Sequence, residues 1–281
     1  MSSRTPIQHY PAQETRDGAG VRLKRALGQG PDQRMDPYLM MDNFSSMDAA
    51  DYIAGFPDHP HRGFETITYM LDGHMLHRDH MGNEGHLGPG DVQWMTAGRG
   101  VIHSEMPRQE AGRMRGFQIW LNLPAALKMQ PARYRDIPAA SLPRAALDAG
   151  GELILLAGEL ELAGQPLSGP IHSPHTQPLI ADIRLAPNTQ LALPLAAELS
   201  ALVYPFEGEV RLAGQTMAAE HTVLLGEGDE LMLEAGEQGA RVLLLAGRPL
   251  AEPVVQYGPF VMNSVAEIEQ AIMDYRAGKL V

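Results

Sequence analysis

Cysteine is absent from the 281 residues of this chain, which excludes disulfide bonds, thiolate metal ligands and a cysteine nucleophile together. Basic residues are also few. The 22 lysine and arginine side chains are outnumbered by 34 aspartate and glutamate side chains, so the formal net charge is −12. This excess of negative charge opposes direct binding to nucleic acid or to an anionic membrane surface. It does not exclude docking to a protein partner.

Long apolar runs are missing as well. The first ten residues, MSSRTPIQHY, lack the apolar core of a signal peptide. No uninterrupted apolar run approaches the roughly 20 residues that span a bilayer as a helix. The sequence therefore predicts a cytoplasmic protein without a membrane span.

Helical signals are scarce, whereas turn residues are plentiful. The chain has 29 glycines and 22 prolines, and between them lie short runs such as ETITYML, FQIWLNL and RVLLLAG. Short apolar or alternating runs between turn residues indicate a β-sandwich or barrel. The clearest helix comes last, where Ser264 can act as N-cap, Glu267 can complete a capping box and Gly278 can end the helix.

Two stretches recur at nearly the same offset. YMLDGHM (69–75) resembles YPFEGEV (204–210), and GPGDVQW (88–94) resembles GEGDELM (226–232). Each half would then have a strand that ends in an acidic-Gly turn and a Gly-x-Gly-Asp turn that opens another strand. We predict two copies of one β unit, although such turns are common in any β protein.

Two histidine-containing pairs carry metal-ligand chemistry. His59 and His61 lie in FPDHPHRGFET, and His103 and Glu105 lie in MTAGRGVIHSEMP. Side chains at i and i+2 of a strand face the same side, so two such strands could bring three imidazoles and one carboxylate to a single ion. This ligand set suits Fe(II), Mn(II), Co(II), Ni(II), Cu(II) or Zn(II).

The repeat provides an internal comparison for this site. The offsets of 135 and 138 place Pro194 and Ala196 where the first copy has its histidine pair, and Arg241 and Leu243 where it has His-x-Glu. None of these four can replace the imidazoles and carboxylate as a set. The sequence therefore predicts a metal site in the first copy alone.

Other readings stay open for several of these residues. A His-x-His pair often occurs by chance, and Glu65 can be a strand residue that pairs with Arg62 or with another neighbour. A further cluster of histidines is spaced mostly by three, which fits no single strand face and is typical of a solvated turn or pocket rim. Within this cluster His77 is the best candidate to approach a substrate. The cluster consists of His74, His77, His80 and His86.

Long motifs carry a family resemblance. HPHRGFETITYMLDG followed by GDVQWMTAGRGVIHSEMP resembles the signature of the pirins, a branch of the cupin superfamily, and the similarity extends from DPYLMMDNF (36–44) to RPLAEPVVQYGPFVMNS (248–264). The resemblance implies an all-β bicupin fold: two cupin (double-stranded β-helix, or jelly-roll) barrels with a short C-terminal helix. We expect a metal-binding N-terminal barrel at 1–135 and a C-terminal barrel without a metal site, including the helix, at 136–281.

The resemblance also implies a ligand set of His59, His61, His103 and Glu105. In the general cupin pattern the fourth protein ligand would be the glutamate at Glu65. Pirins resemble this chain in having a glutamate there too, yet they use the later one. We therefore expect Glu105 as ligand and Glu65 as a residue that orients a ligand or closes its strand.

The function that the resemblance implies is that of a quercetin 2,3-dioxygenase, which opens the central ring of a flavonol with O₂ and releases carbon monoxide. A metal-bound flavonol 3-hydroxyl loses its proton more easily, and Glu105 is the expected catalytic proton acceptor. Fe(II) is the expected cofactor, with the other first-row metals left open. The candidates for an apolar lining, each of which can instead be simple core, are Phe64, Met70, Met95, Ile102, Met106 and Phe117.

The resemblance implies a second class of function too. Some pirins are described as regulatory proteins that bind a transcription factor or a metabolic enzyme, with the metal as a redox-sensitive switch. No partner motif in the sequence supports this alternative. The sequence leaves open the native metal, the physiological substrate, the oligomeric state and the balance between enzymatic and regulatory roles.

Overall fold

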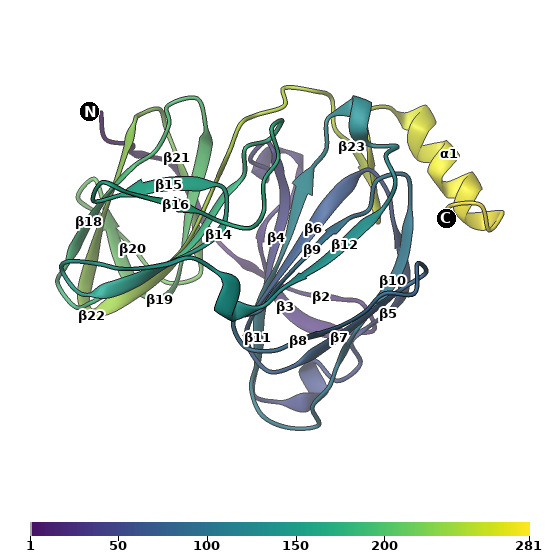
Figure 1. Cartoon of the computed structure of the whole chain (residues 1–281), viewed down its shortest axis with the longest axis horizontal. Helices are drawn as coiled ribbons and strands as arrows, with labels where there is room; N and C mark the ends of the chain where they lie inside the picture. The colour runs from purple at the N-terminus through teal and green to yellow at the C-terminus, as the bar shows by residue number, and fades with distance from the viewer. Residues whose placement is uncertain (1) are drawn as a thin grey trace. The chain divides into compact units, whose positions relative to one another are not determined.

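The computed structural model describes residues 2–281, and nearly all of its regular structure is β-strand (Figure 1). The predicted all-β fold of two barrels with one C-terminal helix is confirmed. Within residues 2–281 no helix has the length and apolar character needed to cross a membrane. The helices are α1 (Val265–Arg276) and the short 3-10 helices η1 (Pro31–Gln33), η2 (Ala49–Asp51), η3 (Ala125–Leu127) and η4 (Ala139–Ser141).

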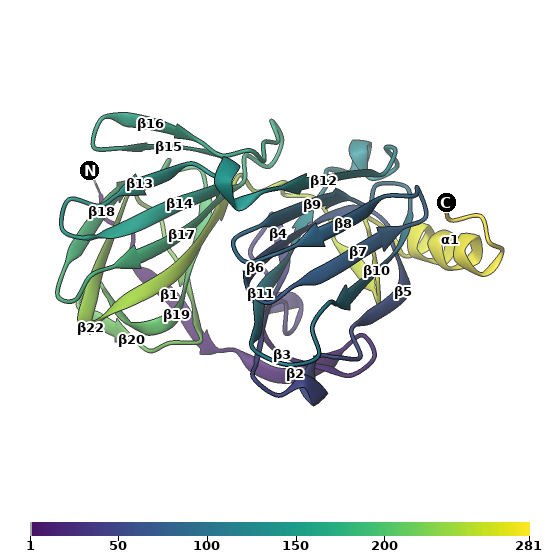
Figure 2. The ribbon, with the colours of Figure 1, turned by 60° about the horizontal axis from the view of Figure 1, so that its bottom comes forward.

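The first compact unit comprises residues 13–29, 38–139 and 250–281. It contains a seven-stranded antiparallel sheet in the order β12 (Arg133–Ile137), β9 (Val92–Thr96), β6 (Phe64–Asp72), β11 (Met114–Asn122), β4 (Tyr38–Ser46), β3 (Val21–Leu27) and β2 (Gln13–Asp17). A four-stranded sheet has the order β5 (Phe56–His61), β10 (Val101–Pro107), β7 (Met75–Asp79) and β8 (Glu84–Leu87) (Figure 2). A hairpin of β23 (Val255–Tyr257) and β24 (Phe260–Met262) precedes α1.

The two larger sheets of the first unit share a hydrophobic core. Val21, Phe44 and Met70 from the seven-stranded sheet pack with Met75 and Leu87 from the four-stranded sheet. Buried residues alternate with more accessible ones in β8 and β10, which is the pattern of strands with one face toward the interior. This packing closes the sheets into a barrel, and the inner face of β10 points toward its interior.

The second compact unit comprises residues 2–12, 30–37 and 140–249. Its main sheet has the order β1 (Pro6–Pro11), β21 (His221–Leu225), β19 (Ser200–Leu212), β22 (Glu230–Gly247), β17 (Leu179–Leu185), β14 (Gly151–Ala157) and β13 (Arg144–Ala146). Further strands are β18 (Gln190–Pro194) on β22, β20 (Gln215–Met217) on β19, and the hairpin of β15 (Glu159–Leu162) and β16 (Gln165–Ser168). Aliphatic side chains from β14 and β17 through β22 form one core cluster, which fills the interior of this barrel.

The sequence suggests two continuous units, 1–135 and 136–281. In the structure the N-terminal segment belongs to the second unit, and the C-terminal segment belongs to the first. β1 pairs with β21 along the register His9↔Val223, so the N-terminal strand belongs to the second unit. α1 and the β23–β24 hairpin belong to the first unit, where Ile268 and Ala271 pack against Phe260. The membership of both segments is decided by backbone pairing and apolar burial, because these join residues that are far apart in the chain.

The C-terminal helix forms as its sequence predicts. The Glu267 N–H donates to Ser264 Oγ at 3.3 Å, and the Ser264 hydroxyl donates to Glu267 Oε2 at 2.9 Å. Gly278, with φ of +68°, follows the last helical turn. The two glycines of the repeated turns, Gly73 and Gly208, also have positive φ, at +87° and +68°. Glycine adopts this conformation without the steric cost that other residues incur.

Candidate metal centre

Two neighbouring strands bring the predicted ligands together. β5 and β10 pair antiparallel, with His103 opposite His59 and Val101 opposite His61. Side chains of paired residues lie on the same face of a sheet, and so do residues two apart on one strand. The three histidines therefore share the face that points into the barrel.

The imidazole rings form one compact cluster. The ring centroid of His59 lies 4.7 Å from that of His61 and 4.3 Å from that of His103, and the His61 and His103 centroids are 5.0 Å apart. One nitrogen from each ring can be chosen so that all three lie within 4.8 Å of one another. His61 and His103 are almost fully buried, at 4% and 1% exposure, and His59 is half-buried.

Hydrogen bonds on the far side of two rings direct their free nitrogens into the cluster. His59 Nδ1 lies 2.9 Å from the Pro57 carbonyl oxygen, and His61 Nδ1 lies 3.4 Å from the Pro259 carbonyl oxygen. A carbonyl only accepts hydrogen bonds, so these contacts favour a proton on Nδ1 and a lone pair on Nε2. The two Nε2 atoms are 3.0 Å apart.

The third ring presents an orphaned nitrogen. His103 Nε2 is buried and has no hydrogen-bond partner among residues 2–281. Burial, together with the neighbouring histidines, also holds the pKa values of His61 and His103 well below the usual 6.5, so both imidazoles are neutral. Facing lone pairs on neutral imidazoles, with one buried nitrogen unsatisfied, fit a divalent transition metal.

The carboxylate of Glu105 lies beside this cluster. A register irregularity between His103 and Glu105 in the pairing with β5 places Glu105 opposite Phe56. Among the described residues, Glu105 forms a ligand group within 4.8 Å with His103 and His77, and no such group contains all four predicted ligands. Its Oε1 accepts a hydrogen bond from the Thr68 hydroxyl at 3.1 Å. His103 is thus common to the two groups.

Glu65 has a different environment. It lies on β6 in the seven-stranded sheet, and its Oε1 accepts a 2.6 Å hydrogen bond from the Thr96 hydroxyl. It is 5% exposed, and burial raises its pKa to about 7. Its partner on the neighbouring strand is therefore Thr96 and not Arg62, whose guanidinium binds Asp274 of α1 at 2.7 Å.

The histidines of the GHMLHRDHMGNEGH stretch separate into two kinds. His74, His80 and His86 are exposed, which agrees with the solvated reading. His77 is fully buried on β7, and it lies behind His103 rather than among the residues that line the cavity. The sequence signal for a buried His77 is the spacing His77-x-Asp79. It is a third i, i+2 pair like the two pairs that contain the predicted ligands.

A cavity of about 650 Å³ opens onto the histidine cluster. His59, His61 and Glu105 line one part of it. The polar side chains of the wall include a partly buried ion pair, in which Arg25 Nε and one of its terminal nitrogens bind the Asp42 carboxylate at 2.9 and 2.8 Å. The larger apolar side chains of the lining are Leu23, Met40, Phe44, Phe56, Met75 and Trp120.

None of the six residues predicted as an apolar lining belongs to this wall. Phe64, Met70, Met95 and Phe117 are fully buried in the barrel, and Ile102 packs beside the core of α1. The other reading of these residues, as simple core, agrees with this burial. Strand alternation identifies inward-facing residues but not which of them another strand covers. Part of the wall comes from β3 and β4, which precede the metal motifs in the chain.

A buried lysine that the sequence analysis did not single out supports the segment after His61. The Lys128 ammonium donates hydrogen bonds to the Gly63 carbonyl at 2.7 Å, to Asn122 Oδ1 at 2.6 Å and to the Val261 carbonyl at 3.1 Å. Burial lowers its pKa to about 8. The three acceptors join the connection between β5 and β6 to β24, so Lys128 stabilises the strand end that carries His61.

Comparisons with known proteins agree on one family. The family model described as Pirin matches residues 20–121, and the model described as Pirin C-terminal cupin domain matches residues 180–281. A Pseudomonas aeruginosa protein named "Putative quercetin 2,3-dioxygenase" is 50% identical over 94% of this chain and 93% of its own length. A pirin-like protein of Caulobacter vibrioides is 47% identical over 99% of this chain and 100% of its own.

A solved structure shows the same fold. The crystal structure of a quercetin 2,3-dioxygenase from Acinetobacter baumannii superposes with a TM-score of 0.89 at 31% sequence identity. The superposition covers 99% of each chain. Both barrels therefore have a counterpart in that protein.

Proposed function

Since this chain belongs to the pirin family, we propose that it is a metal-dependent dioxygenase that cleaves a flavonol such as quercetin with O₂ and releases carbon monoxide. The observation that carries the proposal is the cluster of three imidazoles beside a largely apolar cavity, with the Glu105 carboxylate grouped with one of these imidazoles, that of His103. The names of the Pseudomonas and Acinetobacter relatives support the choice of substrate.

In this proposal His59, His61, His103 and Glu105 hold one divalent metal, with Fe(II) as the expected ion. A bound ion of this kind supplies Lewis acidity toward a hydroxyl oxygen and electron exchange with dioxygen. The neutral state of His61 and His103 supports the role of the imidazoles, because only an unprotonated nitrogen can act as a ligand. Three nitrogens and one oxygen also suit Mn, Co, Ni, Cu or Zn.

Glu105 is the proposed proton acceptor for the 3-hydroxyl of the flavonol. It lines the cavity, it is only 6% exposed, and the Thr68 hydroxyl donates to its Oε1. This hydrogen bond fixes one oxygen and leaves Oε2 to take the proton. While the buried Glu105 carboxyl group holds this proton, the flavonol stays in the form of the electron-rich anion that reacts with dioxygen.

The cavity suits a flat aromatic substrate. A volume of about 650 Å³ lies within the roughly 300–1,000 Å³ of typical small-molecule sites. Phe44, Phe56 and Trp120 offer ring surfaces, while Arg25 and Asp42 offer polar groups to ring hydroxyls. Apolar walls also exclude water from the reacting atoms.

A direct assay of flavonol cleavage tests the proposal. Protein is loaded anaerobically with Fe(II) and then mixed with quercetin in air. It is expected to bleach the flavonol absorbance and to release carbon monoxide in a molar amount equal to that of the quercetin consumed. Each first-row divalent metal is tested in parallel, with the bound metal measured in the same sample. Absence of turnover with every bound metal would overturn the enzymatic proposal and favour the regulatory alternative.

Shortening one cavity side chain tests the substrate position separately. Phe56→Ala is expected to lower kcat/KM for quercetin by at least about two- to tenfold, because an aromatic contact is worth about 0.5–1.5 kcal/mol beyond its buried area. Metal affinity is expected to stay unchanged. Phe260→Ala, at a buried phenylalanine that packs with α1 and does not line the cavity, is the control for a general effect of losing an aromatic ring. A Phe56→Ala enzyme with unchanged kcat/KM would place the substrate elsewhere.

A further inference from the structure

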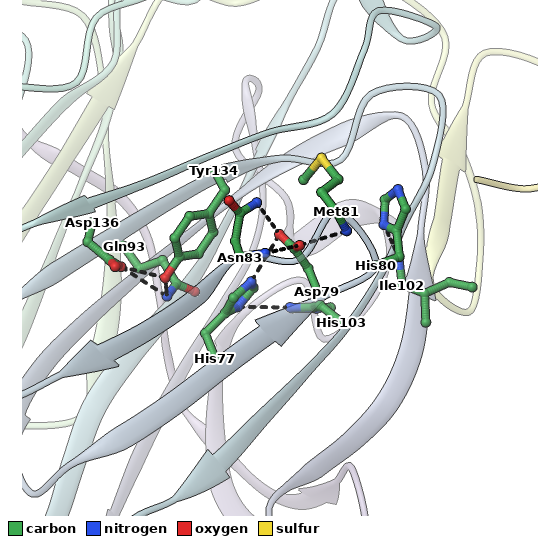
Figure 3. A network of polar contacts seen from close by, with 10 residues as sticks. All are labelled: His77, Asp79, His80, Met81, Asn83, Gln93, Ile102, His103, Tyr134 and Asp136. Atoms are coloured by element: carbon green, nitrogen blue, oxygen red, sulfur yellow. Dashed lines mark hydrogen bonds and ion pairs between the residues drawn. The ribbon is translucent and has the colours of Figure 1, made fainter.

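Behind the histidine cluster lies a chain of buried polar contacts (Figure 3). His103 Nδ1, on the side of the ring away from the orphaned Nε2, lies 3.4 Å from His77 Nδ1. The other nitrogen of His77, Nε2, lies 3.5 Å from Asp79 Oδ2. The side chains of His77 and Asp79 are both 0% exposed.

The Asp79 end of this chain sets the direction of the hydrogen bonds. Asp79 Oδ1 accepts the backbone N–H groups of Met81 and Asn83 at 2.9 and 3.1 Å, and Oδ2 accepts the Asn83 side-chain amide at 2.8 Å. A carboxylate that receives these donors acts as an acceptor toward His77 as well. The His77 proton is therefore on Nε2, and Nδ1 is left as an acceptor.

This order determines the state of His103. With His77 Nδ1 as an acceptor, His103 donates its Nδ1 proton to it and keeps a lone pair on Nε2. That lone pair is the buried, unpartnered nitrogen of the cluster. The same arrangement, in which an outer acceptor fixes the tautomer of a ligand histidine, orients imidazoles in metal sites generally.

The ring of His77 is also held in place. Tyr134 stacks on it with ring centroids 4.4 Å apart and an angle of 26° between the planes. The Tyr134 hydroxyl donates to Asp136 Oδ1 at 2.6 Å and accepts the Gln93 side-chain amide at 2.9 Å. Figure 3 shows this group on one side of His77 and the turn from Asp79 to Asn83 on the other.

We propose that His77 and Asp79 are positioning residues that hold His103 as the Nδ1–H tautomer and aim its Nε2 at the metal. This inference rests on the proposed metal centre. It assigns Asp79 a role for the first time and gives His77 a role other than contact with the substrate. The competing assignment makes His77 a ligand, since it can form a group with His103 and Glu105. Both ring nitrogens of His77 already have partners, whereas His103 Nε2 has none, and this difference favours the positioning role.

Three variants separate these assignments, and Co²⁺ serves as the metal because its visible absorption reports the ligand geometry. His77→Phe keeps the ring and removes the acceptor. His77→Gln restores an acceptor oxygen. In Asp79→Asn the oxygen stays with the backbone N–H groups, so the amide nitrogen faces His77 Nε2 and forces the wrong tautomer, as it does at a catalytic aspartate–histidine pair.

The expected result is a loss of Co²⁺ affinity of about 10- to 100-fold in His77→Phe and in Asp79→Asn, measured by competition with a chelator. His77→Gln is expected to bind within about threefold of the parent protein, with unchanged absorption bands, because its amide oxygen accepts the His103 proton as His77 does. His86→Gln, which removes an exposed histidine of β8, is the control for weak surface binding. Circular dichroism of the metal-free proteins checks that each variant folds, and the isosteric Asp79→Asn tests the inference if His77→Phe does not.

Parent-like affinity in both His77→Phe and Asp79→Asn would overturn the inference. So would altered absorption bands in His77→Gln, because they would make His77 a ligand. A parent protein that binds no Co²⁺ would overturn the metal centre together with this inference. Metal binding without flavonol turnover would remove the proposed reaction alone and leave the positioning role supported.

Discussion

Alanine at His59 is expected to abolish metal binding and any flavonol turnover of the protein. His59 presents Nε2 3.0 Å from His61 Nε2, and its Nδ1 contact with the Pro57 carbonyl fixes the ring. Removal of an outer partner of a ligand already costs about 10- to 100-fold in metal affinity, and loss of a ligand itself is expected to exceed that range. Inductively coupled plasma mass spectrometry of protein dialysed against Fe(II) or Ni(II) measures the bound metal.

Stability provides a second readout for this substitution. Metal at about 100 times its Kd is expected to raise the free energy of unfolding of the parent protein by about 2.7 kcal/mol. The His59→Ala protein is expected to show no such increase. His86→Ala is the matched control, because it removes an exposed histidine and should keep both metal and activity. Activity that survives in both His59→Ala and Glu105→Ala would indicate a contaminant or a different site.

Glutamine at Glu65 is expected to stabilise the metal-free protein at alkaline pH. Burial raises the pKa of Glu65 to about 7, above the 4.5 of an unperturbed glutamate. Between these values the folded chain holds a proton that the unfolded chain releases. The contribution of this group to the free energy of unfolding therefore falls as pH rises from about 4.5 through 7. Above pH 7 the full cost is present, of the order of 3 kcal/mol.

The glutamine side chain copies the neutral carboxyl group and can still accept the Thr96 hydroxyl. Chemical denaturation is expected to show nearly equal stability at pH 4 and an advantage of about 3 kcal/mol for Glu65→Gln at pH 8. An advantage that is the same at both pH values would contradict the titration of Glu65. It would point instead to a difference in packing.

The same variant separates the two glutamates as ligands. We expect Glu65→Gln to keep its metal affinity, because Glu65 belongs to neither group of candidate ligands among the described residues. Glu105→Gln is expected to lose affinity, since an amide oxygen is a weaker ligand for a divalent metal than a carboxylate. The opposite outcome would restore the general cupin pattern, in which the earlier glutamate binds the ion.

Much of the fold follows from local patterns in the chain. Turn residues, short alternating runs and the Ser264–Glu267 capping box predict two β units and the last helix, and the structure contains them. The assignment of segments to units does not follow in the same way. β1 finds its partner more than 200 residues away, and α1 packs in the unit that holds the first half of the chain.

The candidate site likewise has one part that the sequence predicts and one part that it does not. The i, i+2 spacing places His59 with His61, and His103 with Glu105, on one strand face each, and their antiparallel pairing brings His103 opposite His59. The cavity wall could not be predicted in this way. Leu23 of β3 and Phe44 of β4 line the cavity, although both precede the metal motifs in the chain. Met70 and Phe117 lie between or close to these motifs, but other side chains cover them.

The amino-acid sequence alone determined the class of fold, the family resemblance and the residue types at the centre, because strand periodicity, turn chemistry and motif spacing are local properties of the chain. Tertiary structure alone decided that Glu105 lies within 4.8 Å of His103 and His77, and that His77 and Asp79 lie behind His103. It also decided which aromatic rings line the cavity. These features depend on register and on the packing of one sheet against another, and such long-range contacts leave no periodic trace in a single sequence.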